Sequence, residues 1–286
     1  MCVFFKHQEI EKVRLSNMKW SYSRHDFQRV YGILEDLDWI RPREAQLQEL
    51  FYELLKIERE RVFIEALLRK VVYLDDNDSR ARAKEIAAVI TEEWKCQEDE
   101  TVIVGAKKRD SSDGGDILIY NLRNCLKWKE GRIRTTYKEL STIPNVKAII
   151  IADDFIGSGK RMHDVIEDIK KIMPGVPISF VSIGLMESIV RKYYADVLNY
   201  HYYAPVILSP GFDHRKENEV NMMTQIESYL AKRWDNKSLE QYHLGFKQSG
   251  ALFWNRQLRV PNNVYPVFWW GAKADGSPFN SIMGEQ

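Results

Sequence analysis

Two adjacent carboxylates, Asp153 and Asp154, stand between an apolar run and a glycine-rich turn in the segment AIIIADDFIGSGKRM, residues 148–162. Gly157 and Gly159 give this turn conformational freedom, so that successive backbone N–H groups can point inward around an anion. A helix is expected to begin where the anion would lie, and its N-terminus adds partial positive charge. Carboxylates at this place can accept hydrogen bonds from two neighbouring hydroxyls, or hold Mg²⁺ through water beside a pyrophosphate. These residue types together predict a site for a phosphorylated ribose.

A P-loop is the obvious alternative for a glycine-rich turn that carries a lysine. That motif needs glycine at the place of Asp154 and serine or threonine at the place of Arg161. The P-loop interpretation therefore fails at two defining positions.

The segment around Asp153 resembles the phosphoribosyl-pyrophosphate signature of type I phosphoribosyltransferases, in which an apolar strand, two aspartates and a Thr/Gly-rich loop follow one another. The resemblance implies that Asp153 and Asp154 are catalytic, face the ribose hydroxyls and hold Mg²⁺ as the cofactor. It also implies that the loop binds a 5′-phosphate. The loop residues are Ile156, Gly157, Ser158, Gly159, Lys160 and Arg161. That family usually carries a threonine hydroxyl at the end of the loop, whereas this chain has two cations, which can neutralise the phosphate by charge.

A second loop, residues 107–115, follows an apolar strand expected over residues 101–106 and precedes a helix expected over 116–124. In type I phosphoribosyltransferases the corresponding loop binds pyrophosphate, so the resemblance assigns its residues to the leaving group. They are Lys107, Lys108, Arg109, Ser111, Ser112, Asp113, Gly114 and Gly115. A solvated loop that caps the next helix through Asp113 or Asp116 is the alternative. Two phosphate-suited turns about one βαβ spacing apart favour the site.

The last part of the chain is rich in aromatic residues, above all in GALFWNRQLRVPNNVYPVFWWG, residues 250–271. Asn262 and Asn263 can offer amide donors to a ligand. Trp254, Trp269 and Trp270 can stack on a base or a sugar, or can be buried in the core as a wrapping tail, which is the usual fate of tryptophan. Sequence alone favours burial for each single tryptophan.

Together with DDFIGSGK, this tail resembles a phosphoribosyltransferase-like family of effectors in bacterial conflict systems, including retron-type anti-phage modules. The resemblance spans roughly residues 36–271. It implies a regulated toxin that transfers or hydrolyses a group at C1′ of a 5′-phosphorylated ribose, with phosphoribosyl pyrophosphate or a nucleotide as substrate. The implied partners are a reverse transcriptase with its non-coding RNA, another defence-system component, or a second copy of the chain. A catalytically silent module that binds a nucleotide or scaffolds a ribonucleoprotein is the alternative.

Hydrophobic periodicity predicts how these motifs are positioned. Leu47, Leu50, Phe51, Leu54 and Leu55 have helical spacing, and a turn expected over residues 75–79 precedes a second helical stripe, residues 83–94. Strands and helices then alternate, which predicts an α/β fold with a mostly parallel sheet. The expected elements are strands at 101–106, 146–152 and 178–186, helices at 116–124, 163–173, 187–195 and 217–234, and a β-rich run within 197–208. We expect a helical region, residues 1–95, packed on a phosphoribosyltransferase-like domain with a C-terminal extension, residues 96–286.

Composition narrows the class of protein. The chain has 286 residues, 44% of them hydrophobic, which is enough for a full core. Its 42 basic and 41 acidic residues leave a formal charge of +1, so a globally basic nucleic-acid binder is excluded. Cys2, Cys96 and Cys125 lie far apart and suit neither a disulfide framework nor a zinc site. With no signal-peptide or membrane-spanning pattern, the expected location is the cytoplasm.

Overall fold

A parallel sheet forms the centre of the computed structural model, which describes residues 24–107, 115–129, 131–189 and 201–284. The strand order is β3-β2-β4-β5-β6, and β7 also pairs with β5. Each of these pairs is parallel, so the predicted α/β class with a mostly parallel sheet is confirmed. The strands are β2 Thr101–Gly105, β3 Ile133–Arg134, β4 Ala148–Ile156, β5 Ile178–Met186, β6 Tyr202–Tyr203 and β7 Val206–Leu208.

The order of the strands places a topological switch point between β2 and β4. From β2 the chain moves outward to β3 and then crosses back to β4 on the other side of β2. The loops that leave β2 and β4 therefore diverge, and a crevice opens at the carboxyl ends of these two strands. Ligands of open α/β sheets bind in such crevices.

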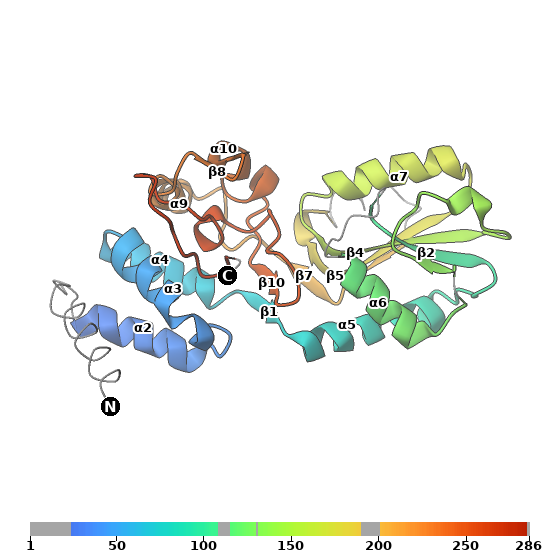
Figure 1. The fold of residues 1–286 in the computed structure, drawn as a ribbon, viewed down its shortest axis with the longest axis horizontal. Coiled ribbons are helices and arrows are strands. Elements are labelled where there is room, and N and C mark those ends of the chain that lie inside the picture. Colours follow the sequence, from blue (N-terminus) through green and yellow to red (C-terminus); the bar gives the residue numbers. More distant parts are fainter. Residues whose placement is uncertain (1–23, 108–114, 130, 190–200, 285–286) are drawn as a thin grey trace, which may run out of the picture.

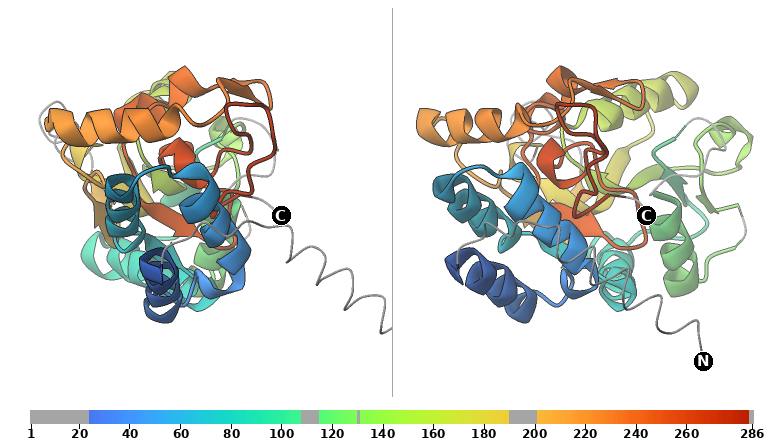
Figure 2. Two further views of the ribbon diagram at one scale, coloured as in Figure 1. Left: turned by 90° about the vertical axis from the view of Figure 1, so that its left-hand side faces the viewer. Right: turned by 60° about the vertical axis from the view of Figure 1, so that its left-hand side comes forward.

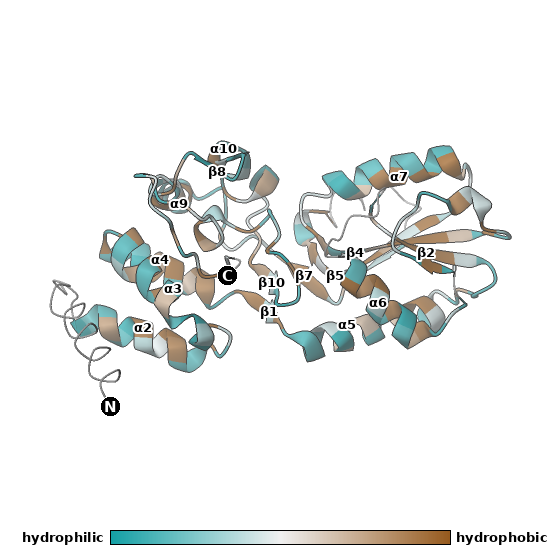
Figure 3. Ribbon diagram, in the orientation of Figure 1, coloured by the Kyte–Doolittle hydropathy of each residue, from teal (hydrophilic) through white to brown (hydrophobic). Residues whose placement is uncertain are grey.

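Helices cover both faces of the sheet (Figure 1). The α5 helix, Asp76–Ala88, and the α6 helix, Gly115–Leu126, lie side by side on one face, while α7, Lys160–Ile172, covers the other. In α7 the apolar side chains that face the sheet are buried, as their spacing predicts; they are Met162, Val165, Ile166 and Ile169. Figure 3 shows this division as apolar strands under a helix whose outer surface is polar.

The N-terminal helices pack against the C-terminal segment (Figure 2). A parallel pair joins the two regions, with β1, Val72–Leu74, beside β10, Phe253–Asn255. Further contacts include the Tyr229 hydroxyl, which donates to Glu60 at 2.7 Å, and the Lys273 ammonium, 2.8 Å from Glu49. A domain boundary at residue 95 stays a prediction, and α5, which precedes it, packs on α6 and β5. The remaining elements here are α2 Arg24–Asp36, η1 Arg41–Arg43, α3 Glu44–Gln48, η2 Glu49–Leu54, α4 Glu58–Leu68, α9 Glu217–Glu227, β8 Arg233–Trp234, β9 Lys237–Ser238, α10 Leu239–Tyr242, η5 Phe246–Gln248 and η6 Pro266–Phe268.

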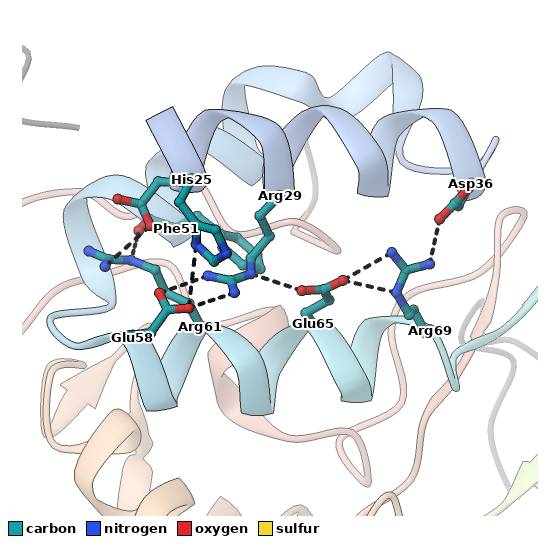
Figure 4. Close-up of polar contacts among 9 residues, drawn as sticks. His25, Arg29, Asp36, Phe51, Glu58, Arg61, Glu65 and Arg69 are labelled. Atoms are coloured by element: carbon teal, nitrogen blue, oxygen red, sulfur yellow. Dashed lines mark hydrogen bonds and ion pairs between the residues drawn. The ribbon is translucent and has the colours of Figure 1, made fainter. Parts of the chain in front are cut away.

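Ion pairs connect α2 with α4 (Figure 4). The Arg29 guanidinium lies 2.7 Å from Glu58 and 2.9 Å from Glu65, and Arg69 lies 2.7 Å from Asp36. The carboxylates of Asp26 and Glu58 also lie beside His25, but Arg29 and Arg61 already balance their charge. Glu58, Glu65 and Arg69 of α4 therefore have a structural role, because they join this helix to α2.

Two expected elements differ from the structure. The turn expected over residues 75–79 is the start of α5, where the Asp75 carboxylate accepts hydrogen bonds from the N–H groups of Asn77 and Asp78. The helix expected over 217–234 ends at Glu227, because the chain turns there so that Leu230 pairs with Lys273 and the Trp234 ring packs on Gly271. Most of the helix expected at 187–195 lies outside the described residues. Each helix in the described part is too short or too polar to cross a lipid bilayer.

Candidate functional site

The two acidic residues lie inside β4, which runs four residues further than the apolar run alone suggests. The pairing of β4 with β5 continues through Asp153 with Ser182 and Ile156 with Leu185. Neighbouring residues of a strand point to opposite faces, so the two carboxylates have different surroundings. Asp153 is 3% exposed, whereas Asp154 is half-buried, and both contribute to the wall of one cleft.

Arg161 ties the loop after β4 to the end of β2. Its Nε donates a hydrogen bond to the carbonyl oxygen of Ala106 at 2.8 Å, and its Nη1 lies 3.8 Å from Asp153 Oδ1. The same carboxylate oxygen accepts a hydrogen bond from the backbone N–H of Asp154 at 3.1 Å. About half of the Arg161 side chain stays exposed, so its guanidinium holds the two loops together and still reaches the cleft.

The glycine-rich turn leads directly into α7. Gly159 is the N-cap of the helix and has φ +69°, a left-handed conformation that favours glycine. Ser158 and Gly159 line the cleft beside the first turn of α7, where the helix dipole and the N-terminal N–H groups attract anions; the Lys160 N–H already donates to Ser158 Oγ at 3.5 Å. The Lys160 ammonium is exposed and pairs with Asp164 at 2.8 Å, one helical turn further on.

Gly157 has a different reason to be glycine. A Cβ at this position would lie 2.1 Å from Asn263 Cγ, so the Asn263 amide packs directly on the predicted phosphate loop, residues 156–161. That amide is held in place because its Nδ2 donates to Ser249 Oγ at 2.8 Å and to the Phe246 carbonyl at 3.3 Å. The C-terminal segment therefore forms part of the phosphate loop's surroundings, more than a hundred residues away in the sequence.

The cleft has a volume of about 1570 Å³ and lies between the sheet's carboxyl edge and the C-terminal segment. Every described member of the predicted phosphate loop lines it, as do Asn262 and Asn263. Asn262 is exposed, whereas the donors of Asn263 are used by the contacts described above. The residues that the sequence analysis grouped therefore lie in one cleft of the structure. The ligand of this cleft stays a prediction.

The other loop of the cleft begins at Lys107, directly after β2. The Lys107 side chain is 8% exposed and its ammonium lies 2.6 Å from Asp116 Oδ2, in the first turn of α6. Lys107 therefore enters the cleft as part of an ion pair. Gly115 begins α6, and the rest of the predicted pyrophosphate loop lies outside the described residues. Those residues are Lys108, Arg109, Ser111, Ser112, Asp113 and Gly114.

Tyr137 forms another part of the cleft wall. Its hydroxyl donates to Asp168 in α7 at 3.2 Å, and its side chain is almost fully buried. Burial and this hydrogen bond raise the pKa of Tyr137 to about 12, so the phenol stays neutral at physiological pH.

The three tryptophans singled out from the sequence are core residues. Trp254, Trp269 and Trp270 are buried, and the indole N–H groups of Trp269 and Trp270 donate to the carbonyls of Val264 and Ala231. The prediction that these tryptophans are buried in the core is confirmed.

The sequence analysis missed several cleft residues besides Tyr137, among them Trp234, Lys237 and Arg259. Trp234 and Lys237 flank a hairpin turn in which Asp235 and Asn236 have positive φ, and Lys237 Nζ lies 5.1 Å from the centre of the Trp234 ring. The dipeptide Asp-Asn was a usable turn signal. Arg259 is exposed in the loop after β10, and no local pattern distinguishes it from other surface arginines.

Mg²⁺ suits this site through a bound substrate better than through protein ligands alone. Asp153 and Asp154 offer carboxylate oxygens, the ligands that Mg²⁺ prefers. In the described part of the chain, however, these two carboxylates are not joined by a third acidic or histidine ligand, and Asp153 already contacts Arg161. Asp154, the more exposed of the two, is the carboxylate that would hold such an ion.

Comparison with known proteins gives a family. Residues 51–284 match the family model described as PRTase-CE. No curated protein matches the sequence significantly. Similar solved structures include the Helicobacter pylori xanthine-guanine-hypoxanthine phosphoribosyltransferase, with 15% identity and a TM-score of 0.32 over 48% of this chain and 83% of that one. Another is a hypothetical protein from Neisseria gonorrhoeae with bound ppGpp, with 13% identity and a TM-score of 0.30 over 53% of this chain and 96% of that one.

Proposed function

Because the chain belongs to the PRTase-CE family, we propose that it binds a 5′-phosphorylated ribose in the cleft and transfers or hydrolyses the group at C1′. One observation carries the proposal: the acidic pair, the glycine turn and the N-terminus of α7 meet at the switch point of a parallel sheet. Phosphoribosyl pyrophosphate or a nucleotide is the substrate in this proposal.

In this proposal, each part of the substrate is bound by residues of suitable charge. The 5′-phosphate is bound by the backbone N–H groups of the turn and the first turn of α7, with Ser158 as a hydroxyl partner. Asp154 accepts hydrogen bonds from the ribose hydroxyls. As the bond at C1′ breaks, positive charge develops on the ribose ring, and the two carboxylates stabilise it. Lys107 and Arg161 stand at the end of the cleft where a pyrophosphate would leave, and Mg²⁺, when bound, supplies further positive charge there.

A catalytically silent binding module is the second candidate. It is favoured because the basic side chains of the cleft named below already have partners within the protein. Lys107 is paired with Asp116, Lys160 with Asp164, and Arg161 with the Ala106 carbonyl. A site whose cations are already partnered can hold a ligand by backbone N–H groups without assisting a leaving group. Formation of product from labelled phosphoribosyl pyrophosphate distinguishes an enzyme from such a module.

We extend the proposal to biology on the sequence resemblance alone. The chain acts as an anti-phage effector, a toxin restrained by a partner such as a reverse transcriptase with its RNA, in the cytoplasm, alone or as a homo-oligomer. Expression of wild type and of an Asp154→Asn variant in bacteria tests the toxic role. We expect growth arrest with the wild type alone; normal growth with the wild type, or equal arrest by both proteins, contradicts a toxin that acts through the cleft.

Titration calorimetry with phosphoribosyl pyrophosphate and Mg²⁺ tests the site itself. We expect wild type to bind, and Asp154→Asn to bind about tenfold more weakly because a charged hydrogen-bond acceptor is lost. Asp99→Asn is the matched control, since Asp99 is exposed, does not line the cleft, and lies before β2, at the opposite end of that strand from the cleft. Absence of binding by wild type, or equal affinity of wild type and Asp154→Asn, overturns the proposed function.

A further inference from the structure

A second groove is lined by residues of α5, of the turn after it and of α6. The two helices lie on the face of the sheet opposite α7 (Figure 1). The volume of the groove is about 530 Å³, within the range of small-molecule pockets. The floor contains small and apolar side chains, Ala87, Ala88 and Leu126, which leave space between the two helices. None of its lining residues belongs to the cleft described above.

The charges along the groove favour an anion. Arg80 and Lys84 are exposed on successive turns of α5, at a spacing that places them on the same face of the helix. Lys84 has no ion-pair partner among the described residues, and the Arg80 guanidinium donates to the neutral Asn77 at 3.0 Å. Glu92 is the single carboxylate among the described residues that line the groove, so the groove keeps a net positive charge.

Asn121 supplies an independent sign of a ligand. Its side chain is polar and only 7% exposed, yet it has no hydrogen-bond partner among the described residues. The amide atoms of Asn121 are not fully enclosed, and the groove that Asn121 lines is the side from which a partner can reach them. Asn124, one turn further along α6, adds a second amide to the same wall.

We propose that this groove is a second ligand site that binds a nucleotide, with its phosphates on Arg80 and Lys84 and its base or ribose on the amides of Asn121 and Asn124. Arginine and lysine bind phosphate oxygens, and asparagine offers both a donor and an acceptor to a base edge. The apolar floor accommodates the face of the base. This site is independent of the proposed function of the cleft.

Cys125 lines the groove and provides a local probe. Its thiol is half-buried. Mass spectrometry of the peptide that contains Cys125 can measure how fast N-ethylmaleimide alkylates this thiol. Cys96 is also a half-buried free thiol but lies outside the groove, so it serves as the internal control. We expect ADP at about ten times its Kd to slow the alkylation of Cys125 about tenfold by occupancy, and to leave Cys96 unchanged.

Variants assign the effect to the residues named. Arg80→Gln/Lys84→Gln and the isosteric Asn121→Asp should both abolish the protection by ADP, the latter because it replaces the amide donor that meets the base or ribose by a carboxylate and lowers the net positive charge of the groove. Arg59→Gln/Lys138→Gln removes the same charge from exposed positions elsewhere and should keep it. Pyrophosphate should protect less than ADP, since it lacks the part that meets the amides. Unchanged alkylation of Cys125 with ADP, equal protection by pyrophosphate, or protection that persists in the Arg80/Lys84 variant overturns the proposal.

Discussion

Replacement of Gly157 by alanine tests whether the C-terminal segment closes the phosphate loop. The new Cβ would lie 2.1 Å from Asn263 Cγ, against about 3.5–4.0 Å for an ordinary carbon contact, so the Asn263 side chain must move by more than about 1 Å. Such a movement breaks its hydrogen bonds to Ser249 and Phe246, at roughly 0.5–1.5 kcal/mol each. We therefore expect Gly157→Ala to lower the free energy of unfolding by about 1–3 kcal/mol, the usual range for overpacking.

A double-mutant cycle isolates this contact. Asn263→Ala removes the atoms that the new methyl group meets, so the alanine at 157 should cost about 1–2 kcal/mol less in the Asn263→Ala background than in wild type. Urea denaturation measures all four proteins, and thermal melting checks the order. Gly32→Ala is the control, because a Cβ there meets nothing within 4 Å and alanine favours the α2 helix. Additive effects within about 0.5 kcal/mol, or a Gly157→Ala variant as stable as wild type, refute the reasoning.

Two further variants test the walls of the cleft. Because the pKa of Tyr137 is raised from 10.0 to about 12, its contribution to stability is complete below pH 10 and is lost as the pH rises towards 12, a difference of roughly 2–3 kcal/mol. Urea denaturation between these pH values should therefore show wild type losing more stability than Tyr137→Phe, and parallel curves contradict the assignment. Lys107→Met leaves the Asp116 carboxylate without its cation and should destabilise the protein by about 1–3 kcal/mol, with partial recovery in Lys107→Met/Asp116→Asn. A double variant less stable than Lys107→Met in thermal melting argues against that ion pair.

Local pattern predicted the elements whose boundaries depend on nearby residues. The strand at residues 178–186 has the bounds expected from its apolar run, since Gly175 and Pro177 precede it and helical residues begin at Glu187. The strand that carries Asp153 is longer than its apolar run, because hydrogen bonding to β5 continues past the point where hydrophobicity ends. Because the hydrogen-bond ladder depends on both strands, the sequence of β4 alone does not determine how far β4 extends.

The prediction that the helix from residue 217 extends to Trp234 was wrong for a related reason. Met223, Ile226 and Leu230 keep the helical period, and Ile226 and Leu230 are indeed buried. The chain nevertheless leaves the helix after Glu227, because Ala231 donates its N–H to the carbonyl of Ala272 and Trp234 packs against Gly271. Contacts with the distant C-terminal segment therefore outweigh a local preference worth only tenths of a kcal/mol per residue.

The two glycines of the phosphate loop show most clearly what a sequence can and cannot reveal. Both were assigned to backbone freedom, and Gly159 fits that assignment with φ +69°. Gly157 does not have a positive φ, so conformation does not explain it, and its neighbour Asn263 does. The same residue type thus serves the turn at one position and the approach of a remote segment at the other. Because residues 257–263 lie on the wall of the same cleft as the predicted phosphate loop, we expect their position to affect the affinity of the ligand proposed for that cleft.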